Sequence, residues 1–199
     1  MPIRGLATAK TRLGPDLDPA TRRVLVEAML RRTLVATRDA RSIAGTVVVT
    51  KDPDVAGLAH AHRAIGLVEQ APGLNEAIDA GRSVAIARGA TAVLVLPADL
   101  PAVSAAVVDE LTAAATTAPG AGALVALVTD RHGRGTNALL LSPPAIIEPA
   151  FGEASRLAHR RAAEAAGARF VELGGPLALD VDTPADLAVA AATLGPRGR

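Results

Sequence analysis

Three aspartates carry the clearest chemical signal in this 199-residue sequence. Asp99 lies between two prolines just after the apolar run 93–96, so we expect it at the exit of a buried strand. Asp180 and Asp182 are two residues apart, which directs both side chains to one side of an extended backbone. Such close carboxylates repel unless a cation lies between them, and three of them suit one or two divalent ions such as Mg²⁺.

Each of these aspartates also has a structural interpretation. Asp99 could be a helix N-cap or a turn carboxylate, and Asp182 could cap a helix that begins at Thr183-Pro184. Capping by Asp182 leaves Asp180 unexplained, so the spacing favours metal binding.

Two basic residues near the start could bind a nucleotide. Lys10 and Arg12 lie in a loop after the first strand, where they could contact phosphates; a solvated basic loop is the alternative. The sequence contains neither a Walker A pattern nor G-x-G-x-x-G after a strand. P-loop kinases and Rossmann dehydrogenases are therefore disfavoured.

Two glycine-bearing loops could bind an anion through backbone N–H groups and hydroxyls. Their candidate residues are Gly133, Gly135, Thr136, Gly152 and Ser155. Ser155 lies near the start of a predicted helix, a position that favours the binding of an anion by the second loop. The alternative is that these residues simply form turns.

The elements that position these residues alternate between strand and helix. We expect strands at 45–50, 66–69, 93–96, 121–129, 138–141, 169–173 and at the start of 177–187, with residues 1–4 forming the end of another. We expect helices near 19–38, 53–62, 74–88, 104–117, 155–167 and after 184. This alternation predicts an α/β fold with a mostly parallel sheet and helices on both faces, whose polar loops gather along one edge.

Length and composition limit the class of protein. The chain suits a single domain spanning 1–199, with 195–199 as a disordered tail. A net charge of +1 and only two aromatic residues disfavour nucleic acid as a partner. Cysteine is absent, which excludes disulfides and thiolate chemistry. With no signal-peptide h-region and no apolar run near the roughly 18 residues of a membrane span, we expect a cytoplasmic protein without a membrane partner.

Six segments together resemble the guanylyltransferases of coenzyme F-420 biosynthesis. They are AKTRL (9–13), LNEAI (74–78), LPADLPAV (96–103), DRHGRGTNALLL (130–141), FGEAS (151–155) and LALDVDTPADL (177–187). That family joins GMP from GTP to 2-phospho-L-lactate, phosphoenolpyruvate or 3-phosphoglycerate. The resemblance covers nearly the whole chain and implies the nucleotide-diphospho-sugar-transferase type of fold.

The resemblance also implies residue roles. It assigns Asp99, Asp180 and Asp182 to Mg²⁺, Thr136, Gly152 and Ser155 to the acceptor's phosphate and carboxylate, Lys10 and Arg12 to the nucleotide phosphates, and Asn75 to the nucleoside. Of these, Asp99, Lys10 and Arg12 would serve catalysis. An acceptor phosphate oxygen would attack the α-phosphorus of GTP in line, without a covalent enzyme intermediate.

Three features depart from the family pattern. The family's first strand begins several apolar residues earlier, so we expect a short first strand here. Arg134 stands where a small residue is usual, and Ala158 stands where an arginine is usual, with Arg156 as a candidate substitute. The last two departures concern the acceptor pocket rather than the metal site.

Among the acceptors we expect phosphoenolpyruvate. The Arg- and Ala-rich composition is typical of a high-GC bacterium, and the bacterial members that this chain resembles use that acid. One alternative is another nucleotidyltransferase or glycosyltransferase of the same fold, with DVD as its metal motif. A second is a catalytically inactive nucleotide-binding subunit. The oligomeric state is open, with a homodimer as the candidate.

Overall fold

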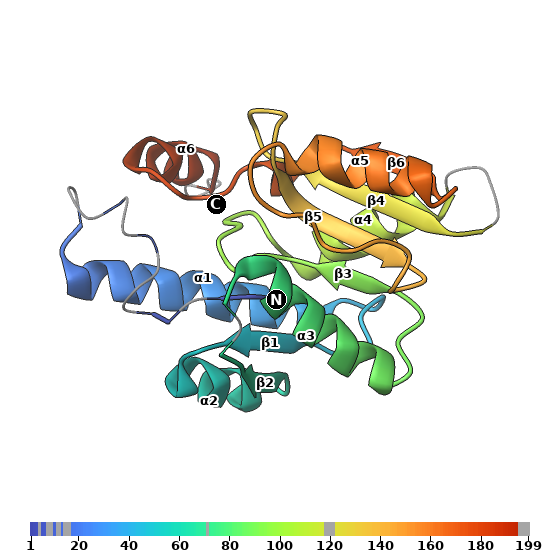
Figure 1. Ribbon diagram of the computed structural model, residues 1–199. Coiled ribbons are helices and arrows are strands. Elements are labelled where there is room, and N and C mark those ends of the chain that lie inside the picture. The colour runs from blue at the N-terminus through green and yellow to red at the C-terminus, as the bar shows by residue number, and fades with distance from the viewer. Residues whose placement is uncertain are drawn as a thin grey trace.

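The computed structural model describes residues 1–3, 5–6, 10, 13, 17–70, 72–117 and 122–194. The strands of this part form two sheets, ordered β1-β2 and β3-β5-β4-β6 (Figure 1). The strands are β1 (Val47–Thr50), β2 (Ile65–Val68), β3 (Val93–Val95), β4 (Leu124–Thr129), β5 (Thr136–Ser142) and β6 (Arg169–Leu173). The helices are α1 (Pro19–Asp39), α2 (Pro53–Ala61), α3 (Leu74–Ala87), α4 (Ala105–Thr117), α5 (Ser155–Ala165), the 3₁₀ helix η2 (Pro176–Ala178) and α6 (Pro184–Leu194). The predicted α/β class with helices flanking the sheet is confirmed.

Alternate residues of the larger sheet pack against different helices. On one face, Val125 and Leu127 of β4 join a buried cluster with Ile78 of α3 and Ala163 of α5. On the other face, Leu124 and Ala126 of β4 pack with Ala115 of α4. Because both faces are buried, the strands read as continuous apolar runs rather than alternating ones.

One strand departs from the predicted parallel arrangement. β1 pairs with β2 and β4 pairs with β6 in parallel, whereas β5 runs antiparallel to both β3 and β4. The reason is the short connection 130–135 between β4 and β5, since a parallel crossover needs about a dozen residues or more.

The strand expected at the start of 177–187 does not form, and that prediction was wrong. The segment instead begins with η2. Gly175 has a φ of 128°, and Pro176 has no N–H to donate to a strand ladder. The backbone is extended at Leu179, and the Val181 N–H then donates to the Asp99 carbonyl at 3.1 Å.

The predicted starts of the first two helices are confirmed. Asp18 accepts from the N–H groups of Ala20 and Thr21, and Asp52 accepts from the Asp54 N–H. A proline opens each helix, where its missing N–H costs nothing.

The first residues pair with β1, as the sequence predicts for a strand end. Pro2 forms a parallel bridge with Val49, and the Ile3 N–H donates to the Val49 carbonyl at 2.9 Å. The predicted tail, 195–199, and Arg4 lie outside the described residues. No helix in the described part of the chain combines the length and apolar character that a bilayer crossing requires.

We predict that Gly66→Ala destabilises the fold by at least about 2 kcal/mol, the upper part of the range for overpacked cores. A Cβ at Gly66 of β2 would lie 2.7 Å from the Ala56 Cα and 2.8 Å from its Cβ in α2, and neither atom can move without moving the helix. Urea denaturation measures the change.

Gly57 of α2 is the matched control, because a Cβ there meets nothing within 4 Å. Gly57→Ala should stabilise the protein by about 0.5–1 kcal/mol through helix propensity. Equal unfolding midpoints for Gly66→Ala and the wild type would contradict the close packing of β2 on α2.

Candidate functional site

The structure brings the three predicted aspartates together. Carboxylate oxygens of Asp99, Asp180 and Asp182 all lie within 4.8 Å of one another. Asp99 follows β3, and the other two follow η2, so the cluster joins segments that are distant in sequence. The Val181 N–H donates to the Asp99 carbonyl at 3.1 Å and holds the two segments side by side.

Lys10 lies inside this acidic cluster. Its ammonium donates to Asp99 Oδ2 and Asp182 Oδ1, and its side chain is only 11% exposed. The sequence had associated Lys10 with nucleotide phosphates, and that contact stays a prediction. Arg12 lies outside the described residues.

The pKa shifts follow from the crowding of charge. Burial alone would lower the pKa of Lys10, but Asp99 and Asp182 raise it above its ordinary value. Burial, followed by the negative charge of Asp99, raises the pKa of Asp180, against a hydrogen bond from Asn137. One ammonium therefore does not fully compensate three carboxylates.

The donor set suits a hard divalent cation. It consists of carboxylate oxygens, which such ions prefer. In the described part of the chain, the buried Oδ1 atom of Asp99 has no hydrogen-bond partner. The ammonium of Lys10 demonstrates that a positive charge fits beside Asp99 and Asp182.

Asp182 does not cap α6, contrary to the structural interpretation of that residue. The Asp186 carboxylate accepts from the Thr183 N–H at 2.7 Å, and the Thr183 hydroxyl accepts from the Asp186 N–H at 3.3 Å. This reciprocal pair satisfies the start of the helix and leaves the Asp182 side chain directed to Lys10.

Asn137 positions the acidic segment and was missed by the sequence analysis. Its Nδ2 donates to the carbonyls of Leu177 and Ala178 at 3.0 Å and to Asp180 Oδ1 at 3.3 Å. Val128 pairs with Ala138, whereas Thr129 pairs with Thr136. Asn137 therefore has no partner in β4 and is the extra residue of a bulge. A bulge re-aims a side chain. The available signal was a buried amide in an otherwise apolar strand.

The predicted acceptor-binding residues form a second group. The Ser155 hydroxyl lies 3.1 Å from that of Thr136, and both side chains are buried. The Ser155 N–H donates to the Gly152 carbonyl at 3.3 Å, and Gly152 has a φ of 137° that favours glycine. These hydroxyls lie at the N-terminus of α5, where a helix favours negative charge.

Asn75, at the start of α3, holds the loop that leads to Gly152. Its Oδ1 accepts from the Phe151 N–H at 2.8 Å, and its Nδ2 donates to the Phe151 carbonyl at 3.1 Å. Both ends of the amide therefore bind the loop backbone. The predicted contact of Asn75 with a nucleoside stays a prediction.

Arg156 ties α5 to its surroundings. Its guanidinium donates to Glu172 at 3.0 Å and to the Gly133 carbonyl at 3.1 Å. Arg134 is exposed, and its N–H donates to Asp130 at 2.8 Å within the β4–β5 loop. Neither guanidinium contacts the Thr136–Ser155 pair in the described structure.

His159 is a second residue that the sequence analysis missed. It lies one helical turn after Ser155, is fully buried, and has its Nδ1 atom 3.1 Å from the Thr136 hydroxyl oxygen. The signal was the i,i+4 spacing from Ser155, which places both side chains on one face of α5.

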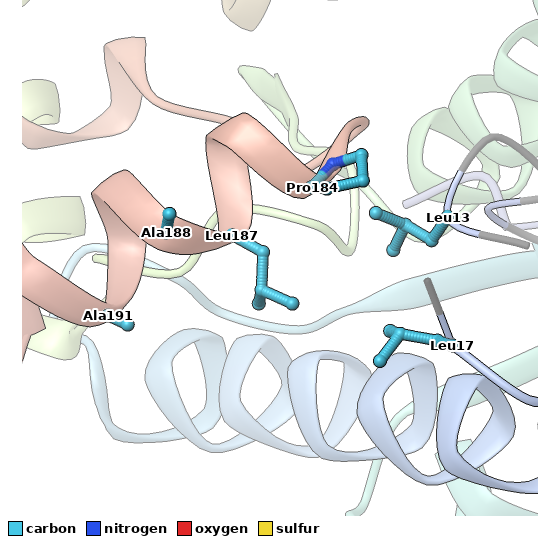
Figure 2. Close-up of a pocket in the computed structure, with 6 residues that line it drawn as sticks. All are labelled: Leu13, Leu17, Pro184, Leu187, Ala188 and Ala191. Carbon is cyan, nitrogen blue, oxygen red and sulfur yellow. The ribbon is translucent and has the colours of Figure 1, made fainter. Parts of the chain in front are cut away.

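An apolar pocket of about 250 Å³ lies between α6 and the segment that leads into α1 (Figure 2). Its lining is Leu13, Leu17, Pro184, Leu187, Ala188 and Ala191. Such a lining offers no group for binding phosphate.

The chain is similar to known proteins over nearly all of its length. The sequence profile of the guanylyl transferase CofC-like family matches residues 1–191. The phosphoenolpyruvate guanylyltransferase of Sphaerobacter thermophilus is 44% identical over 190 residues, which cover 94% of this chain and 88% of that protein. The Rubrobacter xylanophilus protein of the same name is 41% identical, with 94% and 90% covered.

Solved structures support the fold alone. A putative nucleotide-diphospho-sugar transferase from Desulfovibrio desulfuricans superposes with a TM-score of 0.78 and 16% identity, covering 99% of this chain and 87% of that one. A 4-diphosphocytidyl-2C-methyl-D-erythritol synthase gives a TM-score of 0.61 and 18% identity, with 97% of each chain covered.

We predict that Lys10→Met lowers the free energy of unfolding at pH 8 by about 1–3 kcal/mol, the cost of leaving partly buried charges without their partner. Burial, and after it the negative charge of Asp99, raises the pKa of Asp180, so in the folded variant Asp180 binds a proton at higher pH than in the unfolded chain. The deficit should be complete above that raised pKa and shrink as the pH falls through it. Urea titrations in EDTA at several pH values measure it.

Lys51→Met is the matched control, because Lys51 is the sequence's other lysine and is exposed. It should change stability little at any pH. A Lys10→Met deficit that stays constant from pH 8 to pH 4.5 would contradict the electrostatic account of the cluster.

Proposed function

This chain belongs to the guanylyl transferase CofC-like family, and we propose that it transfers GMP from GTP to phosphoenolpyruvate, with release of pyrophosphate, in coenzyme F-420 biosynthesis. The names of its relatives from Sphaerobacter and Rubrobacter support the reaction and the acceptor. The observation that carries the proposal is that one strand connects the acidic cluster to the buried hydroxyl pair. In β5, Asn137 donates to Asp180 of the cluster, and the adjacent Thr136 belongs to the hydroxyl pair.

In this proposal, Asp99, Asp180 and Asp182 hold Mg²⁺. Their oxygens lie close enough to share one ion, and the unpartnered Oδ1 atom of Asp99 supplies a ligand without breaking a bond. When bound, Mg²⁺ would neutralise phosphate charge and orient the triphosphate. Lys10 adds a positive charge at the same place, which suits a site that must bring two anions together.

Thr136, Gly152 and Ser155 bind the acceptor. The hydroxyl pair offers a donor to a phosphate or carboxylate oxygen, and it lies at the N-terminus of α5, where the helix dipole favours negative charge. An oxygen of the acceptor phosphate forms a bond to the α-phosphorus of GTP while the bond to pyrophosphate breaks. The attacking oxygen is already ionised at neutral pH, so no protein group has to accept a proton, and the chain's main contribution is positioning.

The choice of acceptor rests on small differences. Phosphoenolpyruvate and 2-phospho-L-lactate differ mainly in hybridisation at one carbon, and a difference of that size is worth about 1–3 kcal/mol in discrimination. We therefore expect some activity with both acids. The proposal includes a cytoplasmic enzyme, since GTP is a cytoplasmic nucleotide, and a homodimer is our candidate assembly.

The test of the function is pyrophosphate release with GTP, Mg²⁺ and each of the three acids, followed by ATP with the best acid. We expect the highest kcat/KM for phosphoenolpyruvate with GTP. A preference for 2-phospho-L-lactate or 3-phosphoglycerate would refute the acceptor, and a preference for ATP would refute guanylyl transfer. GTP binding in calorimetry without turnover would instead favour a nucleotide-binding subunit.

We predict that Asp99→Asn lowers turnover by at least about a hundredfold, because it removes a charge that the proposed metal site needs. Circular dichroism should be unchanged, since an amide fits the same volume. EDTA should abolish wild-type activity, and added Mg²⁺ should restore it.

Asp54→Asn is the matched control, because the Asp54 side chain is 76% exposed on α2, and this variant should keep wild-type turnover. Full activity of purified Asp99→Asn at saturating Mg²⁺ would show that the three-aspartate site is wrong.

A further inference from the structure

His159 has both ring nitrogens engaged inside the protein. The Ala150 N–H donates to Nε2 at 3.1 Å, so Nε2 presents a lone pair and carries no proton. In a neutral imidazole the remaining proton is then on Nδ1, which lies 3.1 Å from the Thr136 hydroxyl oxygen. His159 therefore donates to Thr136.

The surroundings keep this histidine neutral. Its side chain is fully buried, and burial lowers its pKa to about 4. A proton on Nε2 would also face the Ala150 N–H, donor against donor. At neutral pH the ring is thus a fixed dipole with one donor and one acceptor.

This tautomer decides what the hydroxyl pair can do. Thr136 and Ser155 have two hydroxyl protons between them, and the 3.1 Å contact between their oxygens uses one. An Nδ1 acceptor would take the second proton. Because His159 donates instead, one hydroxyl proton of the pair remains for a group outside it.

His159 also fixes the neighbouring loop. Besides binding the Ala150 N–H, its ring meets that of Phe151 edge to face, with centroids 5.0 Å apart and planes at 70°. Asn75 holds the Phe151 backbone from α3. The loop before Gly152 is therefore held on two sides, one of them through His159.

We propose that His159 is a positioning residue for the anionic acceptor: its Nδ1–H group orients the Thr136–Ser155 pair so that one hydroxyl donates to an oxygen of the bound acid. The inference rests on the proposed function for the identity of the acid. It does not depend on that function for the tautomer or for the direction of the hydrogen bonds.

The kinetic test compares two substitutions that each keep one half of the histidine. His159→Asn retains a donor near the Nδ1 position, and His159→Gln retains an acceptor near the Nε2 position. His159→Gln should raise the KM for phosphoenolpyruvate about tenfold, the effect of one hydrogen bond, with the KM for GTP unchanged. His159→Asn should recover most of the loss.

His60→Gln is the control, since His60 is exposed on α2 and should have wild-type constants. An unchanged acid KM in His159→Gln would overturn the proposal. So would an equal rise in both KM values, or a larger defect in His159→Asn than in His159→Gln. Thermal melts establish that each variant is folded.

A second measurement does not need turnover. Long-range ¹⁵N–¹H spectra of the wild-type protein should report a neutral Nδ1–H tautomer for His159 at pH 7 and still at pH 5. An Nε2–H tautomer, or a protonated ring at pH 6, would overturn the inference even in an active enzyme.

Calorimetry with phosphoenolpyruvate separates this inference from the proposed function. If wild-type protein binds the acid but releases no pyrophosphate with any acceptor, the proposed function fails. The inference then stands if His159→Gln binds the acid about tenfold more weakly than His60→Gln, and falls if the two affinities are equal.

Discussion

The constraint on which the site depends is the confinement of three carboxylates within 4.8 Å of one another. Like charges at that separation repel, and burial makes each one more costly. The fold offsets this in three ways: the Val181 N–H fastens one segment to the other, Asn137 donates to Asp180, and Lys10 places an ammonium between Asp99 and Asp182. Each of these contacts joins parts of the chain that are far apart in sequence, so the cluster exists only in the folded protein.

β5 links the two halves of the site. The Thr136 hydroxyl contacts Ser155 and His159. Asn137, the next residue, donates to the carbonyl of Leu177 in the segment that leads to Asp180 and Asp182. The bulge at Asn137 sets the direction of its side chain, and the short β4–β5 connection imposes the antiparallel direction of the strand. A shift of one residue in the register of β5 would therefore disturb both groups together.

Local patterns predicted what local physics determines. The apolar run before Asp99, the spacing of Asp180 and Asp182, and the Asp-Pro helix starts each depend on neighbouring residues, and the structure confirms their placement. Lys10 is 89 residues from Asp99 and 172 residues from Asp182, and the contacts of Asn137 and His159 arise from packing between elements. No periodicity encodes such contacts. The wrong prediction of a strand at 177 could have been avoided from local sequence. The Gly-Gly-Pro sequence just before it disfavours the hydrogen-bond ladder of a β-sheet.

A buried histidine beside a proposed substrate-binding group is readily interpreted as a general base, and the geometry here argues against that role. A base needs a lone pair directed at the substrate, but the lone pair on Nε2 of His159 is used by the Ala150 N–H. Nor does the proposed reaction need one, because the attacking phosphate oxygen is already ionised. What two anions require is fixed positive charge and fixed donors, since these need no rearrangement as the bond forms. A histidine kept neutral in one tautomer meets the second requirement: it supplies a fixed Nδ1–H donor to Thr136, and because it offers that hydroxyl no acceptor, one proton of the Thr136–Ser155 pair is left for a group outside it.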